Sequence, residues 1–267
     1  MSIGTATTGA ESWSEGYVPA LAANGYAACY VTLRTYRPLR IPQPTDTRLA
    51  DRAMGDMQIS SEYIAYGLHY ISYLSDGLST AVISHSQGGP DVQWALQFWP
   101  STRSVTRAFI ALSPDFRGID LGTSNLSTIC VDDLCQASIW QQSAGSHYYD
   151  ALHDANFEAQ VPTTVIWTET DEVVTPAQQN AQLPSAKAIL AVQDLCPLRI
   201  TDHVLMVVDA AAFALALDAL NHDGTASLVR VLPKALTVCF EISAKNMQIS
   251  LAYQAEADLD AIIDGFL

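Results

Sequence analysis

The nine residues from Ala81 to Gly89 constrain the fold of this chain more than any other segment. An apolar run leads into Ser84-His85-Ser86-Gln87-Gly88-Gly89, and apolar residues at helical spacing follow. This strand–turn–helix pattern is typical of a nucleophile elbow, in which a sharp turn exposes the hydroxyl of its central serine. An ordinary turn serine is the alternative, because a five-residue pattern alone is weak. The flanking strand and helix favour the elbow and make Ser86 the candidate nucleophile.

The rest of the chain alternates short apolar runs with stretches of helical spacing. This alternation predicts βαβ units and a mostly parallel sheet with flanking helices. The expected strands are Ala27–Val31, Ser79–Ser84, Ala108–Leu112, Thr163–Trp167 and Ala188–Val192. The expected helices are Ser60–Leu74, Gly88 to about Pro100, Val204–Leu220 and Ala252–Leu267.

Size and charge set further bounds. A chain of 267 residues that is 49% hydrophobic can bury one large core, so we expect a single domain over 1–267. Arg34–Arg52 holds three prolines and lacks apolar periodicity, which predicts a surface insert over 34–54. The net charge of −15 argues against nucleic acid as a partner. No apolar run approaches the ~20 residues of a membrane span, so no stable membrane insertion is expected.

A carboxylate that follows the strand Thr163–Trp167 is the candidate acid. A serine hydroxyl needs a histidine to take its proton and a carboxylate to orient that histidine. After an elbow, the chain order is serine, acid, histidine. Glu169, Asp171 and Glu172 all lie just past the strand. Position favours Asp171 and leaves both glutamates open.

The candidate base is chosen by chain order. Four histidines follow the serine: His147, His153, His203 and His222. The first two precede the acid and belong to a polar helix, while the last lies in a turn. His203 comes after the last expected strand, in a loop that leads into a helix, where the base belongs. We assign Asp202 a supporting or surface role.

Taken together, these segments resemble fungal lipases of the Candida antarctica lipase B type, which are α/β hydrolases. The shared segments are Gly4–Gly9, Gly16–Pro19, Asn24–Tyr26, Ser84–Gly89, Ser113–Asp115, Trp140–Gln142, Val161–Thr164, Thr170–Val174 and Asp202–His203. The resemblance implies an α/β-hydrolase fold and hydrolysis of triacylglycerols and other esters through an acyl-enzyme. It implies no cofactor and no metal. It also implies a secreted monomer that contacts a lipid–water interface transiently, although Met1–Thr5 shows no signal peptide.

The resemblance also implies roles for individual residues. It places Ser86, Asp171 and His203 in the triad, in preference to the two glutamates, and it assigns the oxyanion hole to Thr5 and Gln87. The substrate pocket would be lined by Thr7, Ser12, His85, Asp115, Gln142 and Val173. The family commonly has tryptophan next to the nucleophile. The histidine in its place here predicts a more polar pocket for the alcohol.

Departures from the family concern the two ends and the cysteines. The chain begins at the Gly4-Thr5 loop, so we expect one inner N-terminal strand to be missing and Cys29 to lack its partner. Cys196 and Cys239 match a family disulfide, and Cys130 is expected to pair with Cys135. Asn125 starts an Asn-x-Ser sequon and predicts a glycan. A catalytically impaired homologue and an acyltransferase on the same fold are the alternative functions.

Overall fold

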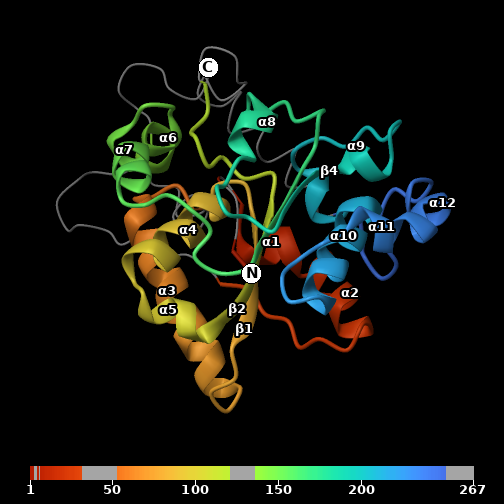
Figure 1. Ribbon diagram of the computed structural model, residues 1–267, viewed down its shortest axis with the longest axis horizontal. Helices are drawn as coiled ribbons and strands as arrows, with labels where there is room; N and C mark the ends of the chain where they lie inside the picture. The colour runs from red at the N-terminus through yellow and green to blue at the C-terminus, as the bar shows by residue number, and fades with distance from the viewer. Residues whose placement is uncertain (3–4, 6, 32–52, 121–135, 251–267) are drawn as a thin grey trace.

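The computed structural model describes residues 1–2, 5, 7–31, 53–120 and 136–250. Four parallel strands form its central sheet in the order β1-β2-β3-β4 (Figure 1). They are β1 (Thr80–His85), β2 (Thr106–Leu112), β3 (Thr163–Trp167) and β4 (Ala188–Ala191). The predicted α/β class is therefore confirmed.

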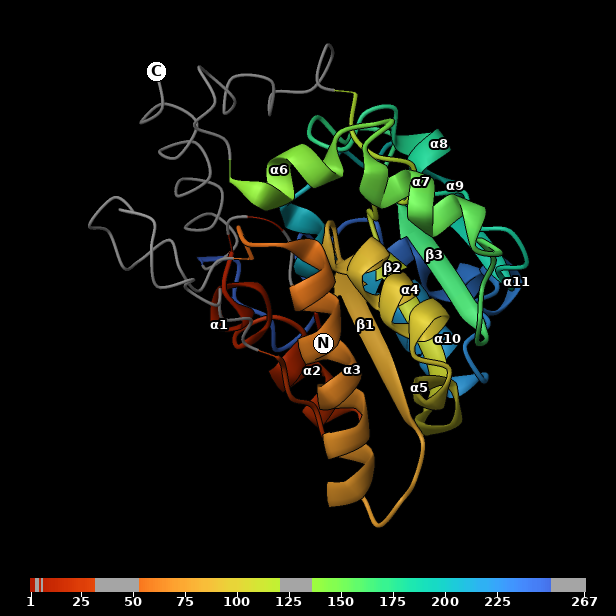
Figure 2. The same ribbon diagram turned by 90° about the vertical axis from the view of Figure 1, so that its left-hand side faces the viewer.

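Helices cover both faces of this sheet. The first half of the chain holds α1 (Gly9–Trp13), α2 (Tyr17–Ala23), α3 (Met57–Leu74), α4 (Gly88–Phe98) and α5 (Ser101–Val105). The second half holds α6 (Ala137–Gln142), α7 (His147–Asp154), α8 (Ala177–Asn180), α9 (Val192–Leu195), η3 (Leu205–Val207), α10 (Ala210–Asn221), α11 (Leu228–Val231), η4 (Leu232–Lys234) and α12 (Ala235–Val238). In Figure 2, α3 and α4 lie on one face of the sheet and α10 on the other. None of the helices in the described ranges has the length and apolarity to cross a bilayer.

The middle strands form the centre of the core. Phe109, Ile110, Ala111 and Leu112 of β2 are all completely buried. Strands of a parallel sheet are covered on both faces, which is why they appear in the sequence as unbroken apolar runs. The three strand predictions at 79–84, 108–112 and 163–167 are confirmed within two residues.

Two predicted elements differ from the structure. The single helix expected over Val204–Leu220 is instead η3 followed by α10. The break occurs at Asp209, whose carboxylate accepts from the amides of Ala211 and Ala212 and caps α10. Ala27–Val31 forms no strand. In the described residues its expected ladder is reduced to two bonds with Met1: the Met1 amine donates to the Cys29 carbonyl at 2.9 Å, and the Val31 amide donates to the Met1 carbonyl at 3.0 Å.

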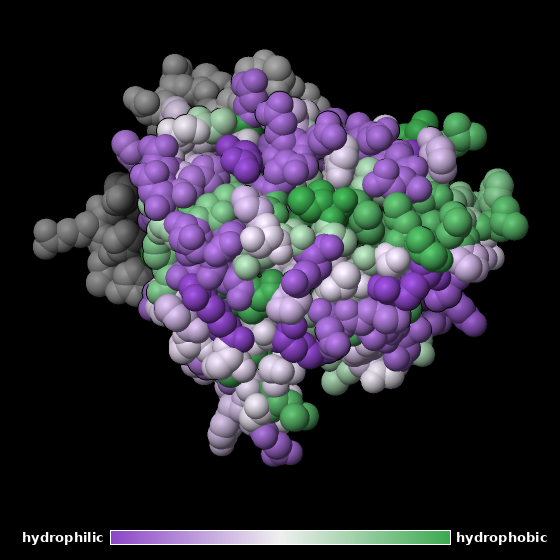
Figure 3. Space-filling view, viewed as in Figure 1, coloured by the Kyte–Doolittle hydropathy of each residue, from purple (hydrophilic) through white to green (hydrophobic). Residues whose placement is uncertain are grey.

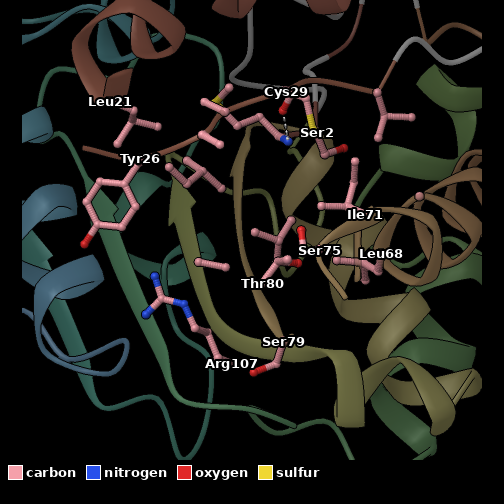
Figure 4. A pocket seen from close by; sticks show the side chains of 18 of the residues that line it. Ser2, Leu21, Tyr26, Cys29, Leu68, Ile71, Ser75, Ser79, Thr80 and Arg107 are labelled. Carbon is pink, nitrogen blue, oxygen red and sulfur yellow. Dashed lines mark hydrogen bonds between the residues drawn. The ribbon is translucent and has the colours of Figure 1, made fainter. Parts of the chain in front are cut away.

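A groove separates residues 27–31 from β1, so the two segments form no ladder of hydrogen bonds. The Ser2 amide donates to the Ile83 carbonyl at 2.8 Å, and Ser2 forms an isolated parallel bridge with Ser84. Within the described ranges, this is the only pairing of β1 on the side away from β2. Beside the rest of that edge lies a mostly apolar groove of about 410 Å³ (Figure 4). It lies between β1, α3 and residues 26–31.

The expected insert is bounded by core residues. Ala53 and Met54, its last two residues, are buried, so the surface interpretation is wrong for them. Both precede the long helix α3, and Ala53 belongs to the same hydrophobic core as Ile64 and Leu68 of that helix. Residues 34–52 lie outside the described ranges, as does the helix expected at 252–267.

Candidate active site

Ser86 occupies the turn between β1 and α4, with φ at +53°. A non-glycine residue in this left-handed region costs of order 1–3 kcal/mol, and such strain is concentrated at functional sites. The turn is held by the Ser86 amide, which donates to the Leu112 carbonyl at 3.0 Å. Gly89 permits it, because a Cβ there would lie 2.5 Å from Pro114 Cβ. The local geometry is that of a nucleophile elbow.

Asp171 and His203 form a buried pair. The Asp171 Oδ2 lies 2.8 Å from His203 Nδ1. Its Oδ1 accepts from the amides of Val173 at 3.1 Å and Val174 at 2.8 Å. Burial alone would raise the pKa of Asp171, but the imidazole and these hydrogen bonds outweigh it, so the pKa is lowered. The carboxylate is therefore charged and fixed in direction.

The same pair shifts the histidine the other way. Burial disfavours the imidazolium, but the adjacent Asp171 carboxylate, with Glu172 and Asp115 farther off, outweighs it and raises the pKa of His203. Glu172 accepts from the His203 backbone amide at 3.2 Å. Glu169 is exposed. Of the three carboxylates that position alone left open, Asp171 is therefore the one that contacts the imidazole ring.

His85 links the histidine loop to the elbow. Its Nε2 lies 2.9 Å from the His203 carbonyl oxygen, so Nε2 carries a proton and donates it. The two imidazole rings are 4.7 Å apart between centroids. Burial and the neighbouring His203 lower the pKa of His85 to about 3, so this residue is neutral. The residue that precedes Ser86 thus holds the loop that carries the candidate base.

The predicted oxyanion residues meet in a side-chain network. Thr5 Oγ1 lies 2.7 Å from Gln87 Oε1 and 2.9 Å from Gln142 Oε1, and its one hydrogen can be donated to either. Gln142 Nε2 donates to Gln87 Oε1 at 3.2 Å. The structure therefore brings Thr5, Gln87 and Gln142 together from three separate parts of the chain.

The remaining predicted pocket residues lie in this neighbourhood or in the N-terminal turn. Ser12 Oγ donates to Thr7 Oγ1 at 3.0 Å, and Val173 is buried beside the candidate acid. Asp115 is completely buried and accepts from the Tyr149 hydroxyl at 2.8 Å. Burial raises the pKa of Asp115 to about 6, although the tyrosine bond opposes the shift.

Sequence reasoning missed two of these polar groups. The sequence pattern places His147 and His153 in a polar helix and gives Tyr149 between them no role, and it gives none to Asp91, in the first turn of α4. Tyr149 and Asp91 are both buried. An aspartate in the first turn of the helix that follows a candidate nucleophile was a usable signal.

Three of the five cysteines lie within the described ranges. Cys196 and Cys239 form the predicted disulfide, with 5.4 Å between their Cα atoms. Cys29 is free and exposed. Cys130, Cys135 and Asn125 lie outside the described ranges. Among the residues that the structure describes, no three His, Cys, Asp or Glu side chains gather as a metal site would require.

Comparisons with known proteins agree with the resemblance, although no family model matches. The chain is 29% identical over 250 residues to "Lipase B" of Pseudozyma antarctica, which covers 91% of this chain and 67% of that protein. Lipase B of Aspergillus fumigatus superposes with a TM-score of 0.79 at 29% identity, over 98% of this chain and 60% of that one. The chain therefore spans about three-fifths of the solved relative. The mature lipase BlEst2 of Bacillus licheniformis, at 16% identity and a TM-score of 0.51 over 70% of this chain and 79% of its own, shares the fold. The predicted resemblance and the α/β-hydrolase fold are confirmed.

Proposed function

We propose that this chain hydrolyses carboxylic esters of lipids, triacylglycerols among them, with Ser86 as nucleophile. The observation that carries the proposal is the buried Asp171–His203 pair, held by His85 next to a strained elbow serine. A serine in this setting gains what it lacks alone, which is a base already oriented by a carboxylate.

The reaction follows from these positions. His203 takes the Ser86 proton through Nε2 as the serine oxygen attacks the ester carbonyl, and Asp171 stabilises the imidazolium that forms. Thr5 and the backbone amide of Gln87 face the oxyanion. The imidazolium then protonates the departing alcohol, which leaves an acyl group on the serine. Water, activated by the same histidine, releases the acid.

The surface supports an apolar substrate. Leu198 and Ile200 are 96% and 82% exposed, and Phe240 and Ile242 are 83% and 63% exposed. The Cys196–Cys239 disulfide and a 2.6 Å bond from Arg199 to the Ile242 carbonyl tie these two stretches together. Apolar residues form a band on this side in Figure 3. Patches of this kind mark contact surfaces, and the loop of His203 begins just beyond Ile200. We propose transient contact with a neutral lipid surface.

The disulfide also bears on location. Disulfides persist in oxidising compartments and are rare in the cytosol. The Cys196–Cys239 bond therefore supports secretion. We propose that the mature chain acts outside the cell as a monomer.

A fluorophosphonate probe tests the assignment together with ester turnover. We expect hydrolysis of p-nitrophenyl esters and of a triacylglycerol emulsion, and covalent labelling at Ser86 located by peptide mass. Added alcohol as a competing acceptor separates hydrolysis from acyl transfer. Labelling at another serine, or turnover that survives loss of Ser86, would refute the proposal.

A catalytically impaired chain is the second candidate, and the groove favours it. Thr5 follows Ser2, the residue that alone pairs with β1 on that side within the described ranges. Among the described residues ahead of Thr5, Met1 bonds to Cys29 and Val31, and Ser2 bonds to Ile83. A segment that pairs with the sheet at one residue holds its dihedrals less firmly than a full strand does. The triad would then be in place while the oxyanion lacks support.

A further inference from the structure

Asp91 is a buried carboxyl group to which the proposed reaction gives no role. It lies in the first turn of α4, close in sequence to Ser86, and it is completely buried. A buried carboxyl group costs free energy unless partners satisfy both of its oxygens. Among the described residues, Asp91 Oδ1 has no hydrogen-bond partner. A residue that serves only the fold would be better satisfied.

The other oxygen of Asp91 contacts the candidate oxyanion network. Asp91 Oδ2 accepts from Gln87 Nε2 at 3.4 Å. The opposite end of the same amide, Gln87 Oε1, accepts from Thr5 Oγ1 or from Gln142 Nε2. A glutamine amide has its donors and its acceptor on different atoms. A contact that holds the nitrogen toward Asp91 therefore turns the oxygen toward Thr5.

We propose that Asp91 is a positioning residue for the oxyanion hole: it orients the side-chain amide of Gln87, and the oxygen of that amide holds Thr5 Oγ1 in place beside the site where the oxyanion forms. The inference rests on the proposed function, because it matters only if an oxyanion forms beside these groups. Asp91 touches no substrate. Its effect reaches the reaction through the side chain of the residue that follows the nucleophile.

The surroundings of Asp91 favour its protonated form. Burial, and after it the charge of Asp115, raise its pKa well above the ordinary value, and Asp56 adds to the shift. The polar side chains of Gln87 and Tyr148 only partly oppose this rise in pKa. A neutral carboxyl group still has a carbonyl oxygen that accepts from Gln87 Nε2. The contact therefore needs an acceptor at this place and no charge.

This environment gives the proposal a signature in stability. The folded protein holds the Asp91 proton more tightly than the unfolded chain does, so this group lowers stability as the pH rises above the ordinary pKa of an aspartate. Removing the carboxyl group relieves that cost. A purely structural residue would behave in the opposite way, and its loss would lower the melting temperature.

Two variants and a matched control form the experiment. Asp91→Asn keeps an acceptor, whereas Asp91→Leu has a similar branched shape and no acceptor. Gln93→Leu removes a buried polar group from the same helix, where Gln93 Nε2 donates to Gln97 and to the Glu158 carbonyl. For each chain, kcat and KM are measured on a short p-nitrophenyl ester. The melting temperature is measured at pH 5 and pH 8.

We expect Asp91→Leu to lose about three- to tenfold in kcat, the range of one hydrogen bond, with KM unchanged and the melting temperature at pH 8 equal or higher. Asp91→Asn should stay within about twofold of wild-type kcat. Gln93→Leu should melt lower with wild-type kcat.

Two results would overturn the proposal. One is a wild-type kcat in Asp91→Leu, and the other is a loss of kcat that accompanies a lower melting temperature, as for a structural residue. A wild-type chain that neither turns over ester nor labels at Ser86 instead removes the proposed function, and this inference with it.

Discussion

The two halves of the candidate site are supported very differently. On the acid–base side, Asp171 has three hydrogen-bond partners and His203 is held from both its ring and its backbone. On the oxyanion side, Thr5 is placed by side-chain contacts to Gln87 and Gln142 and follows a single bridge at Ser2. The contrast teaches that a triad and an oxyanion hole are separate structural problems. The acid–base pair is held by the loops that follow β3 and β4, whereas Thr5 follows a bridge beside β1.

Loss of the nucleophile should have the largest effect. Ser86→Ala removes the attacking oxygen and leaves the Asp171–His203 pair in place. Breaking such a catalytic unit typically costs about 10⁴-fold or more in kcat. Serine and alanine both carry a Cβ, so the positive φ at residue 86 strains them about equally, and we expect only a small change in melting temperature. Undiminished ester turnover in this variant would show that Ser86 and the Asp171–His203 pair do not catalyse the reaction.

Adding a strand at the N-terminus should produce the next largest change in kcat. It acts on the oxyanion side of the site. An extension of about four apolar residues ahead of Met1 would continue the Ser2–Ser84 register along β1 and fill the groove. It would replace the Met1 amine, whose pKa is lowered by burial, with a neutral amide. The added strand would hold the backbone ahead of Thr5 in place. We expect kcat to rise by about 10²-fold, the value of one oxyanion donor.

The control for that extension is a segment of equal length made of glycine and proline, which cannot complete the ladder. Cys29, which lines the groove, supplies a second readout. Its alkylation by iodoacetamide, located by peptide mass, should slow only when the apolar extension is present. Equal activity of the two extended chains and the original would mean that the oxyanion half is already complete.

The pH profile sharpens the comparison from the acid–base side. His203 must be neutral to accept the serine proton, and its pKa is raised above the ordinary 6.5. Therefore kcat/KM should fall about tenfold per pH unit below a midpoint that lies above pH 6.5. The stability contributed by protonated His203 is present at low pH and is lost as the pH rises through the folded pKa. A midpoint at or below 6.5 would show that the carboxylate does not hold the imidazole as described.

The sequence was sufficient wherever a local pattern decides the outcome. The apolar runs of β1, β2 and β3 and the motif around Ser86 are local, and the predictions drawn from them match the fold. Ala27–Val31 failed because a strand is stabilised by its neighbours, and the apolar pattern does not show whether a neighbour is there. The contact of Asp91 with Gln87 spans one helical turn, so its i, i+4 spacing was visible in the sequence. The contacts of Gln87 with Thr5 and Gln142 join separate parts of the chain, so they depend on packing and cannot be derived from sequence spacing.

Deletion of residues 34–52 should have the smallest effect. It tests whether this segment supports the N-terminal region that carries Thr5. The nearest described residues on its two sides are Val31, which bonds to Met1, and Ala53, which is buried in the core. Its composition cannot form a packed core, so we expect a short glycine–serine linker in its place to leave the melting temperature within about 2 °C. That shift corresponds to less than about 1 kcal/mol for a domain of this size.

A control deletion that also removes Ala53 and Met54 should lower the melting temperature, because both side chains are buried. If the shorter deletion destabilises the protein equally, the insert packs against the groove side, and the N-terminal region is better supported than its few described contacts indicate.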